Sequence, residues 1–119
     1  MEEQKFKAVI VWLIANGKTE EALERLAQHY SVCVPRLKVG LPKKHKVRTL
    51  GCYDGKTKTI SVLHSNMLKE PFVILHEFYH HARTGIDMKH RGTEKYASEF
   101  AEKFIQAYRS LVAESLGNN

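Results

Sequence analysis

Residues 71–83 read PFVILHEFYHHAR, and this stretch does most to decide the fold. Pro71 suits the first turn of a helix, and the helical pattern ends where Thr84-Gly85 begins. Polar side chains lie on one side of the predicted helix, opposite an apolar side. The apolar side carries Val73, Ile74, Leu75, Phe78 and Ala82. A helix of this kind packs its apolar side against a core and leaves the polar side for chemistry.

The polar side of this helix has the pattern H-E-x-x-H, formed by His76, Glu77 and His80. Residues four apart lie on one helix face, so the two imidazoles can converge on one metal ion. Glu77 can reach a metal-bound water without being a ligand. Because a metal lowers the pKa of water from about 16 towards about 7, Glu77 can take its proton and pass it to a leaving amine. The alternative is a polar helix face that binds no metal.

The last predicted helix supplies the candidate for a third ligand, since a catalytic zinc site needs three protein ligands and an open position. This helix begins near Thr93 and carries one apolar stripe at helical spacing. The stripe consists of Ala97, Phe100, Ala101, Phe104, Ile105, Tyr108, Leu111 and Val112. Among the acids considered, Glu94 lies closest to the stripe and Glu99 farthest, so Glu94 is the predicted ligand. Its alternative role is a first-turn acid favoured by the helix dipole.

Two further helices are predicted near the N-terminus, over residues 4–15 and 19–30. The first is strongly apolar and ends at Asn16-Gly17; the second is amphipathic, with Thr19 as its N-cap. The apolar run 8–15 is too short to span a bilayer. It resembles the apolar part of a signal peptide, but two glutamates oppose the basic start that such a peptide has. We therefore expect a helix buried on most of its surface.

The middle of the chain predicts a small three-stranded sheet. Residues 32–39, 46–53 and 57–63 alternate apolar and polar side chains in the manner of half-buried strands. Pro35 favours a sheet edge for the first strand, and Asp54-Gly55 predicts a hairpin between the other two. The sheet is therefore expected to be at least partly antiparallel. Together with the helices it predicts an α+β fold that ends in a long glutamate-bearing helix.

The composition suits one soluble globular domain, residues 1–119, because 43% of the residues are hydrophobic and 27% are charged. A formal net charge of +6 leaves nucleic-acid binding open. The charge does not favour nucleic-acid binding, because most of it is dispersed and no aromatic residues interleave with the one basic cluster. That cluster consists of Lys43, Lys44, His45, Lys46 and Arg48. Seven histidines in a chain of this length strengthen the metal hypothesis.

The two cysteines, Cys33 and Cys52, are expected to be free. They form neither a disulfide framework nor a C-x-x-C zinc pattern, and both fall in predicted strands, where a free cysteine is usually a small buried apolar residue. A disulfide between them is the alternative. Free cysteines indicate a reducing compartment, and no apolar run is long enough for a membrane helix. We therefore expect a cytoplasmic protein without a membrane partner.

These motifs resemble those of the gluzincin metallopeptidases, and the size and layout resemble the minigluzincins among them. The resemblance is carried by His76-Glu77-Phe78-Tyr79-His80 and, after thirteen intervening residues, by Glu94-Lys95-Tyr96-Ala97-Ser98-Glu99-Phe100-Ala101. Small regulatory peptidases that cleave repressors share a similar pattern, E-x-x-A-x-x-F-A. Residues 48–53 and 59–62 look like the family's strands beside the cleft. The resemblance implies a zincin-like domain with one Zn²⁺ per chain, held by His76, His80 and Glu94, and Glu77 as general base and acid.

The resemblance also implies how substrate binds. In such enzymes an edge strand binds an extended peptide by β-augmentation, which assigns substrate binding to Gly51, Cys52 and Tyr53. Minigluzincins are described as latent forms whose own chain blocks the cleft, which extends the expectation to a latent, zymogen-like form. The chain departs from the family at Ser98, where larger gluzincins often carry an acid that orients a histidine ligand.

Some side chains near the motif have no clear role in the sequence. Candidates for stabilising an oxyanion are His64, His90, Arg91 and Tyr96. His81 points about 100° away from His80 along the helix and is expected to support a ligand or lie at the surface. The sequence therefore predicts a zinc metallopeptidase, an endopeptidase acting on extended peptides or proteins. The alternative is a basic, metal-stabilised module that binds nucleic acid or a protein partner without hydrolysing it.

Overall fold

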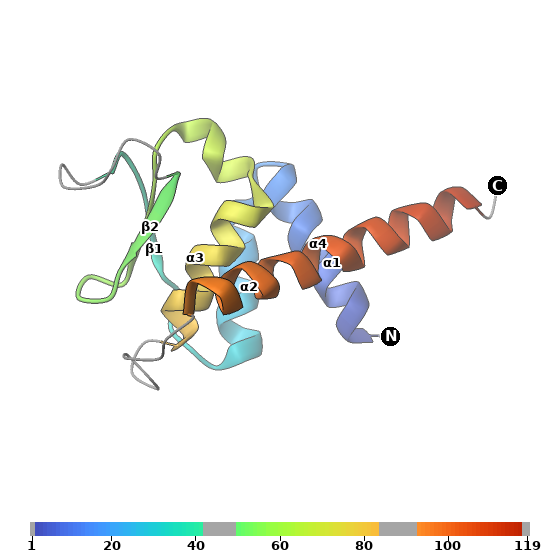
Figure 1. Cartoon of the computed structure of the whole chain (residues 1–119), viewed down its shortest axis with the longest axis horizontal. Coiled ribbons are helices and arrows are strands. Elements are labelled where there is room, and N and C mark those ends of the chain that lie inside the picture. The colour runs from blue at the N-terminus through green and yellow to red at the C-terminus, as the bar shows by residue number, and fades with distance from the viewer. Residues whose placement is uncertain (1, 42–49, 84–92, 118–119) are drawn as a thin grey trace.

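The computed structural model describes residues 2–41, 50–83 and 93–117. Within these ranges the chain forms four α-helices, a three-stranded sheet and a short 3-10 helix, which confirms the predicted α+β class (Figure 1). The elements in chain order are α1 (Glu2–Ala15), α2 (Thr19–Tyr30), β1 (Arg36–Val39), β2 (Gly51–Asp54), β3 (Thr59–Val62), η1 (Ser65–Lys69), α3 (Pro71–Arg83) and α4 (Thr93–Gly117).

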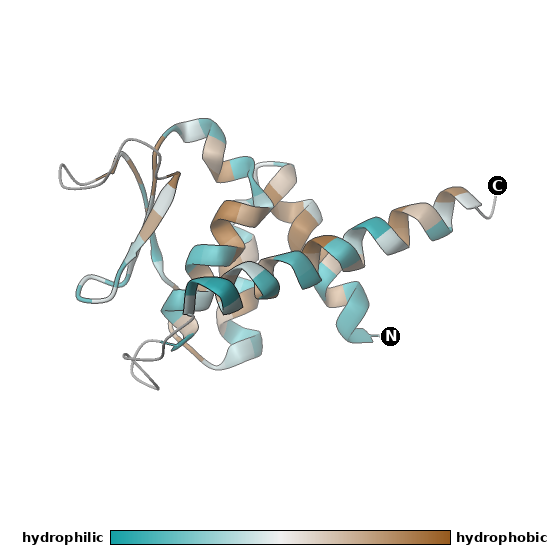
Figure 2. Ribbon diagram, viewed as in Figure 1, coloured by the Kyte–Doolittle hydropathy of each residue, from teal (hydrophilic) through white to brown (hydrophobic). Residues whose placement is uncertain are grey.

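The helices share one hydrophobic core. α4 packs against both α1 and α3, and α2 packs against α1. α1 is buried along one side only, and Val9 and Trp12 in its apolar run are 40% and 46% exposed, so the prediction of a helix buried on most of its surface is wrong. The reason is that α2 and α4 pack against the other side of α1. The apolar side of α3 is buried, as predicted. Figure 2 shows the hydrophobic turns of α1 and α3 in the middle of the molecule. The largest fully buried side chains include Phe78, Phe104, Ile10, Ile14, Leu23 and Leu26.

The start of α2 corrects the prediction that Thr19 is its N-cap. Lys18 occupies the N-cap position, and its side chain makes no capping hydrogen bond. Thr19 is the first helical residue, is buried, and donates its hydroxyl hydrogen bond to the carbonyl oxygen of Leu68 in η1. The sequence did not predict η1, which leads from β3 towards α3. Because a buried hydroxyl needs a partner, Thr19 joins α2 to η1 instead of capping its own helix.

The sheet has the strand order β1–β3–β2, so β1 and β2 are its edges among the strands described. β2 and β3 form the predicted antiparallel hairpin, in which Gly51 pairs with Val62 and Asp54 with Thr59. β1 runs parallel to β3, which makes the sheet mixed. Each described strand has four residues. β1 and β3 are shorter than the predicted stretches that contain them, and β2 ends at Asp54, one residue beyond its predicted stretch. Pro35 directly precedes β1, in agreement with its edge position.

Several sequence predictions lie outside the described ranges. They concern the start of the second strand at residues 46–49, the basic cluster at residues 43–48, and the polar loop at residues 86–92 with His90 and Arg91. Within the ranges that are described, no helix is long and apolar enough to cross a bilayer.

Both cysteines are free, so the alternative of a disulfide between them is wrong. Cys52 lies half-buried in β2, as a free strand cysteine is expected to. Cys33 is exposed and precedes β1, so its predicted place in a buried strand is wrong. The reason is that pairing with β3 begins only at Arg36, after Pro35.

β2 lies close against α3 at Gly51. A Cβ atom placed on Gly51 would lie 2.9 Å from Cγ1 of Val73, 3.3 Å from the carbonyl oxygen of Ser61 and 3.5 Å from Cγ of Glu77. The first distance is shorter than the separation that two carbon atoms in contact adopt in folded proteins. β2 and α3 can therefore lie this close only because glycine has no side chain.

Gly51→Ala is therefore expected to lower the free energy of unfolding by about 1–3 kcal/mol, because the added methyl group forces the strand or helix to shift. Urea unfolding measures this change. Gly117→Ala is the matched control, since nothing lies within 4 Å of a Cβ at that position. In a Val73→Ala background the Gly51 substitution should cost less, because the nearest clashing atom is gone. Equal unfolding free energies for Gly51→Ala and the wild type would contradict the close approach.

Candidate metal centre

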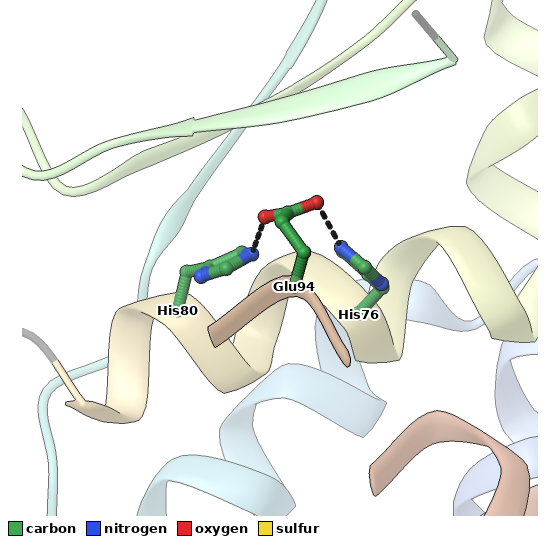
Figure 3. Close-up of side chains that lie close together, drawn as sticks. All are labelled: His76, His80 and Glu94. Atoms are coloured by element: carbon green, nitrogen blue, oxygen red, sulfur yellow. Dashed lines mark hydrogen bonds and ion pairs between the residues drawn. The ribbon is translucent and has the colours of Figure 1, made fainter. Parts of the chain in front are cut away.

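Three donor side chains converge where α3 meets the first turn of α4 (Figure 3). His76 and His80 lie one turn apart on one face of α3, and Glu94 reaches them from α4. Oε2 of Glu94 lies 3.1 Å from Nε2 of His76, and Oε1 lies 2.7 Å from Nε2 of His80. One donor atom from each residue lies within 4.8 Å of the other two. The structure thus brings together the three residues that the sequence predicts as ligands.

This group could hold a divalent metal ion. Zinc binds imidazole nitrogen and carboxylate oxygen at about 2.0–2.2 Å, so donors around one tetrahedral ion lie about 3.4 Å apart. The nitrogen–oxygen separations of 3.1 and 2.7 Å are close to that value. The side chains of His76 and His80 are 13% and 19% exposed, whereas that of Glu94 is 80% exposed. The donors are therefore enclosed on the α3 side and open to solvent on the other.

Local electrostatics favour a metal-binding form of His80. Burial lowers the pKa of His80, although the negative charge of Glu94 opposes this effect. The neighbouring His76 lowers the pKa further. A lower pKa favours the neutral imidazole, which is the form that binds a metal ion.

Ser98 supports His76 from α4. Its Oγ lies 3.3 Å from Nδ1 of His76, where it can accept a hydrogen bond from Nδ1–H. That bond fixes the tautomer whose Nε2 is available to a metal ion. Ser98 and Glu94 are four residues apart on α4 and therefore lie on the same face of that helix. This face supplies the carboxylate of Glu94 to the metal group and the hydroxyl of Ser98 that contacts His76. The sequence marked Ser98 as a departure from the gluzincin pattern, and the packing of α4 on α3 shows which histidine it contacts.

Glu77 is buried beside the three donors but is not one of them. The sequence places it on the polar side of the helix; in the structure it is 8% exposed and its Cγ lies against β2 at Gly51. Burial raises the pKa of Glu77 from 4.5 to about 7, and the negative charge of Glu94 raises it as well. A carboxyl group with a pKa near 7 can both accept and release a proton at neutral pH.

The three residues predicted to bind substrate lie in β2, which passes over the donor group in Figure 3. Gly51 allows the close approach to α3. Cys52 is half-buried; burial raises the pKa of its thiol, and the negative charges of Glu77 and Asp54 add to that effect. The hydroxyl of Tyr53 lies 2.7 Å from Nδ1 of His81 on α3. The strand is therefore in contact with the motif helix at both Gly51 and Tyr53.

The remaining candidates are distributed around the site. Of the four residues considered for oxyanion stabilisation, His64 is exposed at the N-cap of η1 and Tyr96 is exposed in the first turn of α4. His90 and Arg91 lie outside the described residues. His81 is buried, so of its two expected positions the one at the surface is wrong.

Comparison with known proteins gives no match: no family model matches the chain, and no curated protein or solved structure matches it significantly. The interpretation of the site therefore depends on its residues and their geometry.

Proposed function

We propose that the protein is a zinc-dependent peptidase of the gluzincin type. The observation that supports this most strongly is the convergence of His76, His80 and Glu94 beside the buried carboxyl group of Glu77. When bound, zinc supplies a Lewis acid that polarises the scissile carbonyl group and lowers the pKa of a water molecule to about 7.

The composition of the donor group favours a catalytic metal over a structural one. Structural zinc sites have four protein ligands, usually including cysteine. Among the residues that the structure describes, the group has three donors and no cysteine. The thiol of Cys33 lies instead 3.8 Å from Nε2 of His81. This difference distinguishes the proposed peptidase from the alternative, a basic module whose metal only stabilises the fold.

Glu77 moves the proton in the proposed reaction. Its carboxylate takes a proton from the attacking water and then delivers it to the nitrogen of the leaving amine. Burial favours this exchange, because it raises the pKa of Glu77 to about 7, where the carboxyl group can both accept and release a proton at neutral pH. Its place beside the donors, and outside the donor set, suits a base that must reach water without binding the metal.

β2 has the backbone groups that an extended peptide needs. The amide of Leu63 donates to the carbonyl oxygen of Leu50 at 2.9 Å, which makes these two residues a hydrogen-bonded pair. Because such pairs alternate along an antiparallel ladder, the backbone N–H and C=O groups of Gly51 and Tyr53 point away from β3. We propose that a substrate pairs with this outer edge by β-augmentation and so passes over the metal group.

Hydrolysis is tested with zinc-loaded protein and unfolded casein. New amino termini should form, formation should stop when a chelator removes the zinc, and it should resume when zinc is restored. Binding of one zinc per chain without any hydrolysis would contradict the peptidase and support the binding module.

Ser98→Ala is expected to weaken zinc binding by about tenfold, because a partner that orients a histidine ligand typically contributes at least this much. Competition with a coloured chelator measures the affinity. Ser115→Ala, at an exposed position further along α4, is the control and should bind zinc like the wild type. Equal affinities for Ser98→Ala and Ser115→Ala would show that Ser98 does not orient His76.

A further inference from the structure

His81, next to the proposed ligand His80, makes two short contacts with segments far away in the sequence. It lies on α3 and is 4% exposed. Its Nε2 lies 2.6 Å from the carbonyl oxygen of Cys33, in the segment before β1. Its Nδ1 lies 2.7 Å from the hydroxyl oxygen of Tyr53 in β2. One imidazole ring therefore joins α3 to the edge strand β2 and to the segment that precedes β1.

The chemistry of the partners determines the direction of these hydrogen bonds. A carbonyl oxygen can only accept, so Nε2–H of His81 donates to Cys33. In the neutral ring Nδ1 is then an acceptor, and the hydroxyl of Tyr53 donates to it. The rings of Tyr53 and His81 also meet edge to face, with their centroids 5.3 Å apart. Both ring nitrogens of the buried His81 therefore have a hydrogen-bond partner, as buried polar groups require.

We infer that His81 is a positioning residue, which holds β2 at a fixed height above the donor group. Within the described residues β2 is four residues long and pairs with β3 alone, so its own ladder restrains it weakly. The close approach of Gly51 to Val73 restrains one end of the strand, and His81 restrains the other end through Tyr53. The role in substrate binding rests on the proposed function, since an extended peptide would pair with the edge that His81 holds.

Tyr53→Phe tests the inference with the least disturbance, because it removes one hydroxyl and keeps the ring. The first measurement is the rate at which a thiol reagent modifies Cys52 in a Cys33→Ser background, which leaves Cys52 as the only cysteine. Loss of one hydrogen bond should make the opening of β2, and hence labelling, roughly three to ten times faster. Tyr108→Phe, on α4, is the control and should label at the background rate.

Substitutions at His81 provide a rescue test. In His81→Gln the amide nitrogen can donate to Cys33 and the amide oxygen can accept from Tyr53, so labelling should stay near the background rate. His81→Phe keeps an aromatic ring but loses both hydrogen bonds, so labelling should be at least as fast as in Tyr53→Phe. If His81→Phe does not fold, the comparison of Tyr53→Phe with His81→Gln alone decides the matter.

The second measurement separates this inference from the proposed peptidase. With an extended peptide substrate, Tyr53→Phe should raise KM roughly three- to tenfold, while kcat changes by less than about twofold and zinc content stays at one per chain. If Cys52 is labelled faster in Tyr53→Phe but the wild-type protein hydrolyses no peptide, the role of His81 is supported and the proposed peptidase is contradicted. Unchanged labelling in both Tyr53→Phe and His81→Phe, or loss of zinc from Tyr53→Phe, would overturn the inference.

Discussion

Replacing Glu77 by Gln is expected to reduce peptide hydrolysis by about 10²- to 10⁴-fold while zinc remains bound at one per chain. The amide has nearly the same shape as the carboxyl group but cannot take a proton from water. Zinc binding should survive because Glu77 is not one of the three donors. The fold should also survive, since Glu77 is buried and a neutral amide suits that environment at least as well as a carboxylate.

The matched control is Glu99→Gln, the same chemical change at an exposed position on α4. It should hydrolyse casein at the wild-type rate. Both variants are assayed after zinc loading, with zinc content measured on the same samples. Full activity in Glu77→Gln would exclude Glu77 as the general base.

Replacing Glu94 by Ala is expected to weaken zinc binding on the order of a hundredfold. Binding of zinc to a protein site is worth on the order of 10 kcal/mol, and one of three ligands accounts for about 3 kcal/mol of it. The side chain contacts both Nε2 atoms, at 3.1 and 2.7 Å, so its loss leaves His76 and His80 without the carboxylate between them. Metal content by mass spectrometry, after dialysis against a weak chelator, measures the effect.

Glu102→Ala is the control for this experiment, because Glu102 is an exposed acid on the same helix. Its zinc content should equal that of the wild type. Glu94 also lies in the first turn of α4, where an acid favours the helix by about 0.3–1 kcal/mol, so a small loss of stability is expected without any metal. Zinc that stays stoichiometric in Glu94→Ala would remove Glu94 from the ligand set.

The central part of the site was predictable because it depends on local geometry. Two histidines four residues apart on a helix must share a face, whatever the rest of the chain does. Predicting Glu94 also required the apolar stripe of the last helix. The stripe marks the buried face of that helix, and Glu94 lies at the edge of that face. The α+β class followed in the same way, from stretches of helical and of alternating periodicity.

The features that the sequence did not predict depend on contacts between distant segments. Nothing local indicates that β1 runs parallel to β3, or that the Thr19 hydroxyl bonds to Leu68 instead of capping its helix. His81 illustrates the same limit. Its place on α3 indicates only that it faces away from His80, and its partners come from segments 28 and 48 residues earlier. Such contacts are set by tertiary packing, which periodicity does not encode.

The claim that His76, His80 and Glu94 hold one zinc in an open site is tested most directly by X-ray absorption at the zinc edge of the loaded protein. The account predicts a shell of nitrogen and oxygen only, with multiple scattering from two imidazole rings and no sulfur, at one zinc per chain. A sulfur ligand, a third imidazole, or protein that retains no zinc would contradict it.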